Sequence, residues 1–314
     1  MKEKPFTSIN EQIELLQRRG VQTDDTTRRL LMMEGYYPVV NGYKAPFIDH
    51  PATDKAGDDR YLPGTSFDDI YDLFSFDRKL RELTFHYLLR IEALIENVCT
   101  YTFTESHQGA SSYLARENYA TRREYGEIGL RRYDENLDKL MRSFCDAIDR
   151  PKNDAVAYYR ESYGFVPLWV LMRTLTFGTT EHFFNLMSRR DQTCICKYIA
   201  ETVGNPFCGK KQLAPIKARR AIDVLVKYRN LCAHDERLYC ASIDKRNPVD
   251  FFGCVKYASR FMTLGDYLEF LEGIARLVDQ YSEKGEILRH LLNSTGFGEF
   301  AETELPKMAV AMEA

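Results

Sequence analysis

Residues 66–104 read SFDDIYDLFSFDRKLRELTFHYLLRIEALIENVCTYTFT. Apolar residues recur in this stretch at every third or fourth position, which is the spacing of one face of an α-helix. The residues of this apolar stripe are Ile70, Leu73, Leu80, Leu83, Tyr87, Leu88, Ile91, Leu94, Ile95 and Val98. We therefore expect the longest helix of the chain here, and a mostly α-helical fold.

Two shorter helices are expected before this one. Ser8 and Glu11 have the spacing of a capping box, in which each side chain bonds the backbone N–H of the other, and Gly20 ends that helix. Asp24 or Asp25 then caps a second helix. The sequence thus predicts a helical hairpin at the N-terminal side of the long helix.

The segment between the hairpin and the long helix has two parts. Residues 35–43, GYYPVVNGY, contain Asn41-Gly42, a pair typical of tight hairpin turns, so a short β-ribbon or an ordered loop is expected. Residues 49–64 are polar and contain two prolines and two glycines, which favours a linker or surface loop.

The chain is expected to divide near residue 60. Residues 1–60 would form an N-terminal helical region with the short ribbon or loop, and residues 61–300 a helical bundle. Residues 106–163 have the least regular pattern and are interpreted as an excursion from that bundle. Further helices are predicted at residues 122–148, 191–203, 212–234, 264–281 and 284–292.

The composition is that of a globular protein, since 44% of the 314 residues are hydrophobic and 28% are charged. The net charge is −3, so contact with a nucleic acid has to depend on local basic patches. The densest patch contains one acid, Asp223, and seven basic residues: Lys210, Lys211, Lys217, Arg219, Arg220, Lys227 and Arg229. Its charges could equally be a solvated helix face.

Localisation is expected to be cytoplasmic. The eight cysteines follow no regular framework, which fits reduced thiols in a reducing compartment. No run of about 18 apolar residues is present that could span a membrane, and no signal peptide is visible.

Residues 227–239, KYRNLCAHDERLY, contain the pair of residues with the clearest chemistry. On a helix, Asn230 and His234 lie one turn apart on the polar face, whereas Arg229 falls within the apolar stripe. An imidazole can take up or release a proton near neutral pH, and a guanidinium binds phosphate oxygens through its planar fork. Cleavage of RNA by its own 2′-hydroxyl needs both kinds of group and no metal.

The same spacing also has a purely structural interpretation. An arginine in an apolar stripe is seldom buried without a partner, so Arg229 could be a core arginine paired with Glu92 or Glu96. If the helix of residues 66–104 lies beside that of residues 212–234, Glu92 would orient Arg229.

Several residues near this pair are candidate RNA contacts. They are Lys227, Arg237, Tyr239 and Arg220. Single-stranded RNA stacks its bases on aromatic rings, but most of the 20 tyrosines and 19 phenylalanines stand at core-like helical positions. Tyr228 and Tyr239 are the expected exceptions, because they flank the motif.

The segment Arg229-Asn230-x-x-x-His234 resembles the R-x4-6-H motif of ribonucleases of the HEPN superfamily, in which a polar residue follows the arginine. Its extension through Arg237-Leu238-Tyr239 resembles the Abi-like (abortive infection, Abi-D/F type) proteins of that superfamily. Two further stretches are similar to the family's pattern and stand in the same order: residues 4–43, from Lys4-Pro5-Phe6 to Gly42-Tyr43, and residues 167–178, from Pro167-Leu168-Trp169 to Phe177-Gly178.

The resemblance implies a HEPN-like helical bundle and a metal-independent endoribonuclease that needs no cofactor. Arg229 and His234 would be catalytic, and Asn230 would orient the histidine or the RNA. It further implies a homodimer in which two such motifs face each other across a two-fold axis. The biological setting implied is antiphage defence, with the enzyme as a toxin that a small RNA or a protein antitoxin restrains.

Two functions of other classes remain open. The same bundle could be a non-catalytic RNA-binding or protein-interaction module, in which Arg229 and His234 act only as an RNA clamp. Residues 8–34 could also form a DNA-binding helix-turn-helix, although the second helix offers Arg28 and Arg29 and few side chains suited to base edges.

Overall fold

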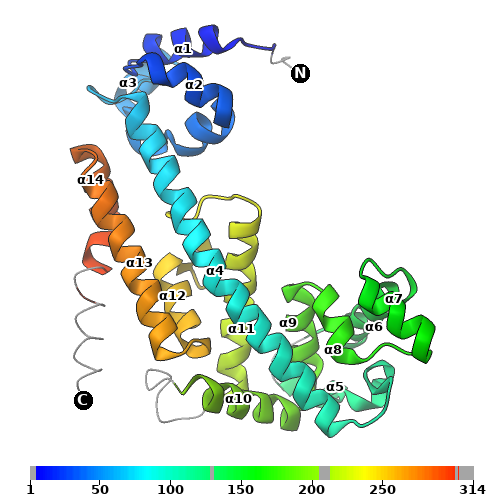
Figure 1. Ribbon diagram of the computed structural model, residues 1–314. Helices are drawn as coiled ribbons and strands as arrows, with labels where there is room; N and C mark the ends of the chain where they lie inside the picture. The colour runs from blue at the N-terminus through cyan, green and yellow to red at the C-terminus, as the bar shows by residue number, and fades with distance from the viewer. Residues whose placement is uncertain (1–4, 128–130, 205–212, 301–302, 304–314) are drawn as a thin grey trace. The chain divides into compact units, whose positions relative to one another are not determined.

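The computed structural model describes residues 5–127, 131–204, 213–300 and 303, and it is mostly α-helical, as expected (Figure 1). The longest helix of this part of the chain is α4, which contains the stretch that led to the expectation. The α-helices are α1 (Ile9–Arg18), α2 (Asp25–Glu34), α3 (His50–Ala56), α4 (Phe67–Ser106), α5 (Arg122–Glu127), α6 (Tyr133–Asp149), α7 (Asp154–Tyr163), α8 (Leu168–Leu171), α9 (Phe177–Leu186), α10 (Arg189–Val203), α11 (Pro215–Ala233), α12 (Phe251–Ala258), α13 (Leu264–Ser282) and α14 (Glu286–Ser294).

The chain forms two compact units. The first unit comprises residues 1–83, 235–240 and 270–314, and the second comprises residues 84–234 and 241–269. The helices α4 and α13 each contribute residues to both units, and the boundary expected near residue 60 falls inside the first unit. None of the helices in the described residues is long and apolar enough to cross a membrane.

The N-terminal helical hairpin has the predicted caps. Ser8 and Glu11 form the reciprocal capping box at the start of α1. Asp24 caps α2 by accepting hydrogen bonds from the backbone N–H groups of Thr26 and Thr27. These caps satisfy backbone donors that an α-helix leaves unbonded at its N-terminus.

The ribbon predicted at residues 35–43 is wrong, because these residues form the π-helical turn η1 (Tyr37–Asn41). A tight hairpin turn at Asn-Gly needs positive φ angles, whereas Gly42 has φ −68°. The buried Val39 and Val40 pack this turn into the first unit. Part of the loop expected at residues 49–64 is also wrong, since Asp49 caps the short helix α3.

The close approach of α4 and α13 in the first unit depends on a glycine. A Cβ atom at Gly273 would lie 2.9 Å from Cδ2 of Leu83, so a larger residue would force the side chain of Leu83 aside. The ring of Phe76 lies on α4 and is fully buried, 5.6 Å from the ring of Tyr281 and 5.3 Å from that of Phe297. This aromatic cluster ties the C-terminal helices to the first half of α4.

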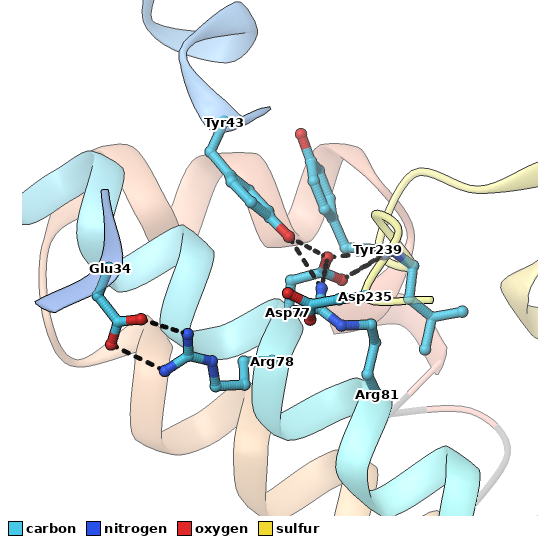
Figure 2. A network of polar contacts seen from close by, with 8 residues as sticks. Glu34, Tyr43, Asp77, Arg78, Arg81, Asp235 and Tyr239 are labelled. Carbon is cyan, nitrogen blue, oxygen red and sulfur yellow. Dashed lines mark hydrogen bonds and ion pairs between the residues drawn. The ribbon is translucent and has the colours of Figure 1, made fainter. Parts of the chain in front are cut away.

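A buried carboxylate on α4 connects three segments of the first unit (Figure 2). Asp77 accepts hydrogen bonds from the Tyr43 hydroxyl at 2.6 Å and from Nη1 of Arg81 at 2.7 Å. It also accepts from the backbone N–H of Leu238 at 3.0 Å and from that of Tyr239 at 2.6 Å. Burial raises the pKa of the Asp77 carboxyl, while the hydrogen bond from Tyr43 and the charge of Arg81 lower it.

Arg81 extends this network to the residue that follows His234. Its Nη1 also donates to the Tyr43 hydroxyl at 2.9 Å, and its Nη2 contacts the Asp235 carboxylate at 2.5 Å (Figure 2). Arg237 donates from Nη1 to the backbone carbonyl of Gly42 at 3.0 Å. The segment 235–240 is therefore held in the first unit by main-chain and side-chain contacts.

Aromatic residues form much of the core of the second unit. The ring of Phe183 on α9 lies 5.1 Å from Phe103 and 5.9 Å from Phe144, and all three are fully buried. Phe144 belongs to α6, so part of residues 106–163 packs into this core. A β-ribbon is present in this unit, where β1 (Ser242–Ile243) pairs antiparallel with β2 (Val249–Asp250).

The buried network predicts a large loss of stability on substitution of Asp77. Asp77→Ala should lower the free energy of unfolding by about 3–5 kcal/mol, because Arg81 and two backbone N–H groups lose their acceptor in the core. Urea denaturation of both proteins measures this. Asp72→Ala on the same helix removes a partly exposed pair with Lys284 (3.0 Å) and should cost less than about 1 kcal/mol. Equal losses in the two variants would contradict the role assigned to Asp77.

Candidate functional site

The residues predicted to be catalytic lie at the C-terminal end of α11. Pro215 stands in the first turn of this helix, where its missing N–H leaves no hydrogen bond unmade, and the helix ends at Ala233 with His234 as its C-cap. The backbone N–H of His234 donates to the carbonyl of Asn230 at 3.0 Å. The side chains of Asn230 and His234 are exposed, as the helical spacing predicted.

Arg229 is held by a carboxylate of α4 in the second unit. Its Nε lies 3.0 Å from Oε2 of Glu92 and its Nη2 lies 3.5 Å from Oε1. The guanidinium carbon lies 5.8 Å from the centre of the Phe85 ring, within the range of a cation–π contact. Glu92 and Glu96 were both considered as partners of Arg229. The structure pairs Arg229 with Glu92, and it pairs Glu96 with Arg173.

The guanidinium of Arg229 is neither buried nor fully solvated. The side chain is 24% exposed and that of Glu92 is 12% exposed. Nη1 of Arg229 forms no hydrogen bond within the parts of the chain that the structure describes. The carboxylate therefore orients the planar fork and leaves one of its nitrogens available to a ligand oxygen.

The predicted basic contacts on α11 are neutralised within the second unit. Nζ of Lys227 lies 2.7 Å from Asp223, and Arg220 lies 2.9 Å from Asp223 and 3.0 Å from Asp244. Lys210 and Lys211, which the sequence placed in the same patch, lie outside the described residues. The positive charge of this helix is thus smaller than its basic residues alone indicate.

The two tyrosines expected to be open for stacking are buried, contrary to that expectation. Tyr228 is fully buried and donates from its hydroxyl to the carbonyls of Val249 at 2.9 Å and Ala241 at 3.2 Å. Tyr239 is 7% exposed and its ring stacks on that of Tyr43 at 6.1 Å. Packing therefore accounts for both rings.

The structure divides the sequence-predicted residues between its two units. Arg220, Lys227, Arg229, Asn230 and His234 belong to the second unit. Arg237 and Tyr239 belong to the first, in the segment anchored by Asp77. Among the described residues, no three His, Cys, Asp or Glu side chains gather in a way that could hold a metal ion.

Asp77 is the most connected polar residue that sequence reasoning missed. A signal for it existed, because Asp77 stands between Leu73 and Leu80 in the apolar stripe of α4, where a carboxylate has to find partners. Those partners lie far away in the chain, at Tyr43 and in residues 235–239. The sequence pattern therefore marks the position without identifying what binds there.

One comparison with known proteins found a match. The model of a family described as Abi-like protein matches residues 29–240 of the 314. No curated protein and no solved structure matches the chain. The match confirms the resemblance at the level of the family, and it fits a role in abortive infection, a form of antiviral defence.

The contact between Arg229 and Glu92 predicts a measurable coupling. A double-mutant cycle of Arg229→Ala and Glu92→Ala, followed by urea denaturation, should give an interaction free energy of about 1 kcal/mol, because both groups are largely shielded from water. The matched pair Lys227 and Asp223 on α11 is more exposed and should give about 0.5 kcal/mol or less. A coupling for Arg229 no larger than that of Lys227 would show that Glu92 does not fix the guanidinium.

Proposed function

Since the chain belongs to the Abi-like protein family, we propose that it is a metal-independent endoribonuclease of the HEPN type that acts in abortive infection. The observation that carries the proposal is the end of α11, where an oriented and partly exposed Arg229 precedes an exposed Asn230 and an exposed His234. A phosphate-binding group and a proton-transfer group stand there within five residues of each other.

The proposed reaction is transesterification within the RNA. His234 acts as general base and removes the proton of a 2′-hydroxyl, and the 2′-oxygen attacks the neighbouring phosphorus. The bond from phosphorus to the 5′-oxygen of the next nucleotide breaks, and that oxygen receives a proton. The products carry a 2′,3′-cyclic phosphate and a 5′-hydroxyl.

Arg229 supplies the positive charge that this reaction needs. Negative charge builds up on the non-bridging oxygens as the fifth bond to phosphorus forms, and a guanidinium already in place stabilises it without reorganising. Glu92 provides that placement through Nε and Nη2, and Nη1 would bind the phosphate in the proposed complex. Asn230 stands one helical turn before His234 and orients the imidazole or the RNA.

A second copy of the chain completes the site in this proposal. A histidine that has taken up the proton of the 2′-hydroxyl cannot at the same moment donate one to the leaving oxygen. In a two-fold dimer with the ends of both α11 helices together, one His234 is the base and the other the acid. As a toxin component, such an enzyme would be restrained by an RNA or protein antitoxin until infection.

A binding module is the second candidate, and one observation favours it. Arg229 is already paired with Glu92, and Lys227 and Arg220 are paired with acids, as in a structural helix without a reactive centre. In that case the chain would bind RNA or a protein and leave RNA intact. His234→Ala would then still bind.

Purified protein should cleave a mixed pool of cellular RNA in the presence of EDTA and leave cyclic phosphate ends. His234→Ala and Arg229→Ala should each reduce the rate by about a hundredfold or more, because each removes a group that acts in the transition state. Expression of wild type, but of neither variant, should slow bacterial growth. The measurements are the rate of RNA cleavage and the chemical identity of the product ends.

Matched controls are available on helices of the first unit. His290→Ala on α14 and Arg276→Ala on α13 replace exposed residues of the same types and should cleave at the rate of wild type. Products with 3′-hydroxyl ends, or cleavage abolished by EDTA, would refute the mechanism. Intact RNA together with RNA binding by wild type and by His234→Ala would support the binding module.

The dimer predicts how cleavage depends on concentration. Below the dissociation constant of the dimer, the rate should fall with the square of the protein concentration, because two chains form one site. Sedimentation of the same samples should show the monomer in that range. A rate proportional to concentration while the protein sediments as a monomer would show that one chain is sufficient.

A further inference from the structure

An open hollow in the second unit has no role in the reaction proposed above. It has a volume of about 580 Å³, within the usual range for a small-molecule site, and α4 and Trp169 of α8 form its walls. Six of its lining residues are Glu96, Thr100, Tyr101, Thr104, Glu105 and Trp169. The five from α4 recur with helical spacing, so they form one continuous strip of its surface.

Two aromatic side chains border the hollow and remain solvated. Trp169, the one tryptophan of the chain, is 56% exposed, and Tyr101 is 59% exposed. Most aromatic residues of this unit are buried, and large rings left on a surface beside a hollow are typical of a binding site. Tyr101 is held at its hydroxyl, which donates to Glu105 at 3.1 Å, and its ring meets that of Tyr198 in a T-shaped contact with the ring centres 5.7 Å apart.

The polar groups of the hollow lie deeper than its rings. Glu96 is 7% exposed and Thr100 is 4% exposed. Within the described residues, the hydroxyl oxygen of Thr100 is buried and has no hydrogen-bond partner. A buried hydroxyl without a partner is unusual in a native protein, and a ligand group or an ordered water in the hollow would satisfy it.

From this arrangement we infer that the hollow binds a nucleobase of an RNA strand, with guanine preferred. The base would stack on Trp169 and Tyr101 and present its Watson–Crick edge to Glu96. Guanine has two adjacent N–H donors on that edge, at N1 and N2, which match the two oxygens of a carboxylate. Uracil has a single N–H between two carbonyl oxygens, and a carboxylate repels these.

A cationic side chain of a protein fits the hollow less well. Nη1 of Arg173 already lies 3.5 Å from Glu96 and supplies the positive charge that this carboxylate needs. Burial raises the pKa of Glu96, and the charge of Arg173 opposes that rise. The remaining requirement is for neutral N–H donors, which a base provides. Arg173 is 60% exposed, so its guanidinium can also contact the phosphate of the bound nucleotide.

The hollow begins one helical turn along α4 from Glu92, the residue that binds the proposed catalytic arginine. Glu96 follows Glu92 by four residues on α4, which is a rise of about 6 Å, and Glu92 binds Arg229. A strand with its base in the hollow would thus run towards the end of α11. The inference rests on the proposed function in one respect, that the bound strand is RNA. Binding of the strand can be measured without cleavage.

Trp169 reports directly on the hollow because it is the one tryptophan of the chain. We would titrate the full-length protein with 2′-O-methyl oligouridine containing one guanine, and with the all-uridine oligomer of equal length. The 2′-O-methyl group blocks cleavage. The guanine oligomer should quench the tryptophan emission in a saturable way and bind about tenfold more tightly than the all-uridine oligomer, as expected for a charge-assisted hydrogen bond.

Conservative variants test each contact. Glu96→Gln keeps the shape and should abolish the preference for guanine, whereas Glu201→Gln, an exposed acid on α10, should keep it. Tyr101→Ala should weaken the binding of both oligomers by about tenfold, because stacking is lost. Tyr158 on α7 is similarly exposed, and Tyr158→Ala should leave the binding of both oligomers unchanged.

The outcomes separate this inference from the proposed function. If guanine quenches the tryptophan emission of a protein that does not cleave RNA, the inference of a base site is supported and the proposed nuclease activity is refuted. Cleavage without any difference between the two oligomers would refute the base site and keep the nuclease. Quenching by an apolar dye and by neither oligomer would identify the hollow as a protein-docking groove and overturn the inference.

Discussion

The first unit depends on one buried carboxylate, Asp77. A carboxylate in an apolar core is strongly unfavourable unless donors surround it, and this one accepts from Tyr43, Arg81 and two backbone N–H groups. The donors come from Tyr43, which follows η1, from α4 itself and from residues 238–239, which lie far apart in the chain. Their joint requirement for one acceptor fixes which segments meet, whereas apolar packing alone would tolerate several arrangements.

The long helix α4 serves both units by the same means, with acids placed among apolar residues along its length. Asp77 binds the segment after His234 in the first unit. In the second unit, Glu92 binds Arg229 and Glu96 binds Arg173. Each acid is largely or fully buried and each takes a cation or N–H donor from another part of the chain. The buried acids of this helix, and not its apolar stripe, therefore fix the positions of Arg229, Arg173 and the segment after His234.

Local signals in the sequence predicted local structure. They failed where the conformation depends on residues that are distant in the sequence. The caps at Ser8 and Asp24 require only neighbouring residues, and both are present as predicted. Asn41-Gly42 is a strong turn signal, yet Gly42 has a negative φ and residues 37–41 form a π-helical turn in which Val39 and Val40 are buried. The family resemblance likewise rested on an ordered set of local motifs and was confirmed.

The candidate site shows the same limit of prediction. Helical spacing predicted which side chains of α11 face water, but it could not distinguish Glu92 from Glu96 as the partner of Arg229, since both acids lie on one face of α4. The hollow beside Glu96 was missed because nothing local distinguishes Trp169 from a core tryptophan: its neighbours Leu168 and Leu171 are buried and it is not. Exposure of a large ring is a property of the folded surface.

The pairs Arg229–Glu92 and Arg173–Glu96 of the second unit indicate how a nearly neutral protein would bind RNA under the proposed function. With a net charge of −3 and with Lys227 and Arg220 paired to acids, long-range attraction to RNA is weak. Arg229 and Arg173 stand on acids one helical turn apart, and each keeps part of its guanidinium exposed. Their charge acts at short range and in a fixed direction. In the proposed complex with RNA, recognition would then depend on fit at the hollow and at the end of α11, and not on the overall field of the molecule.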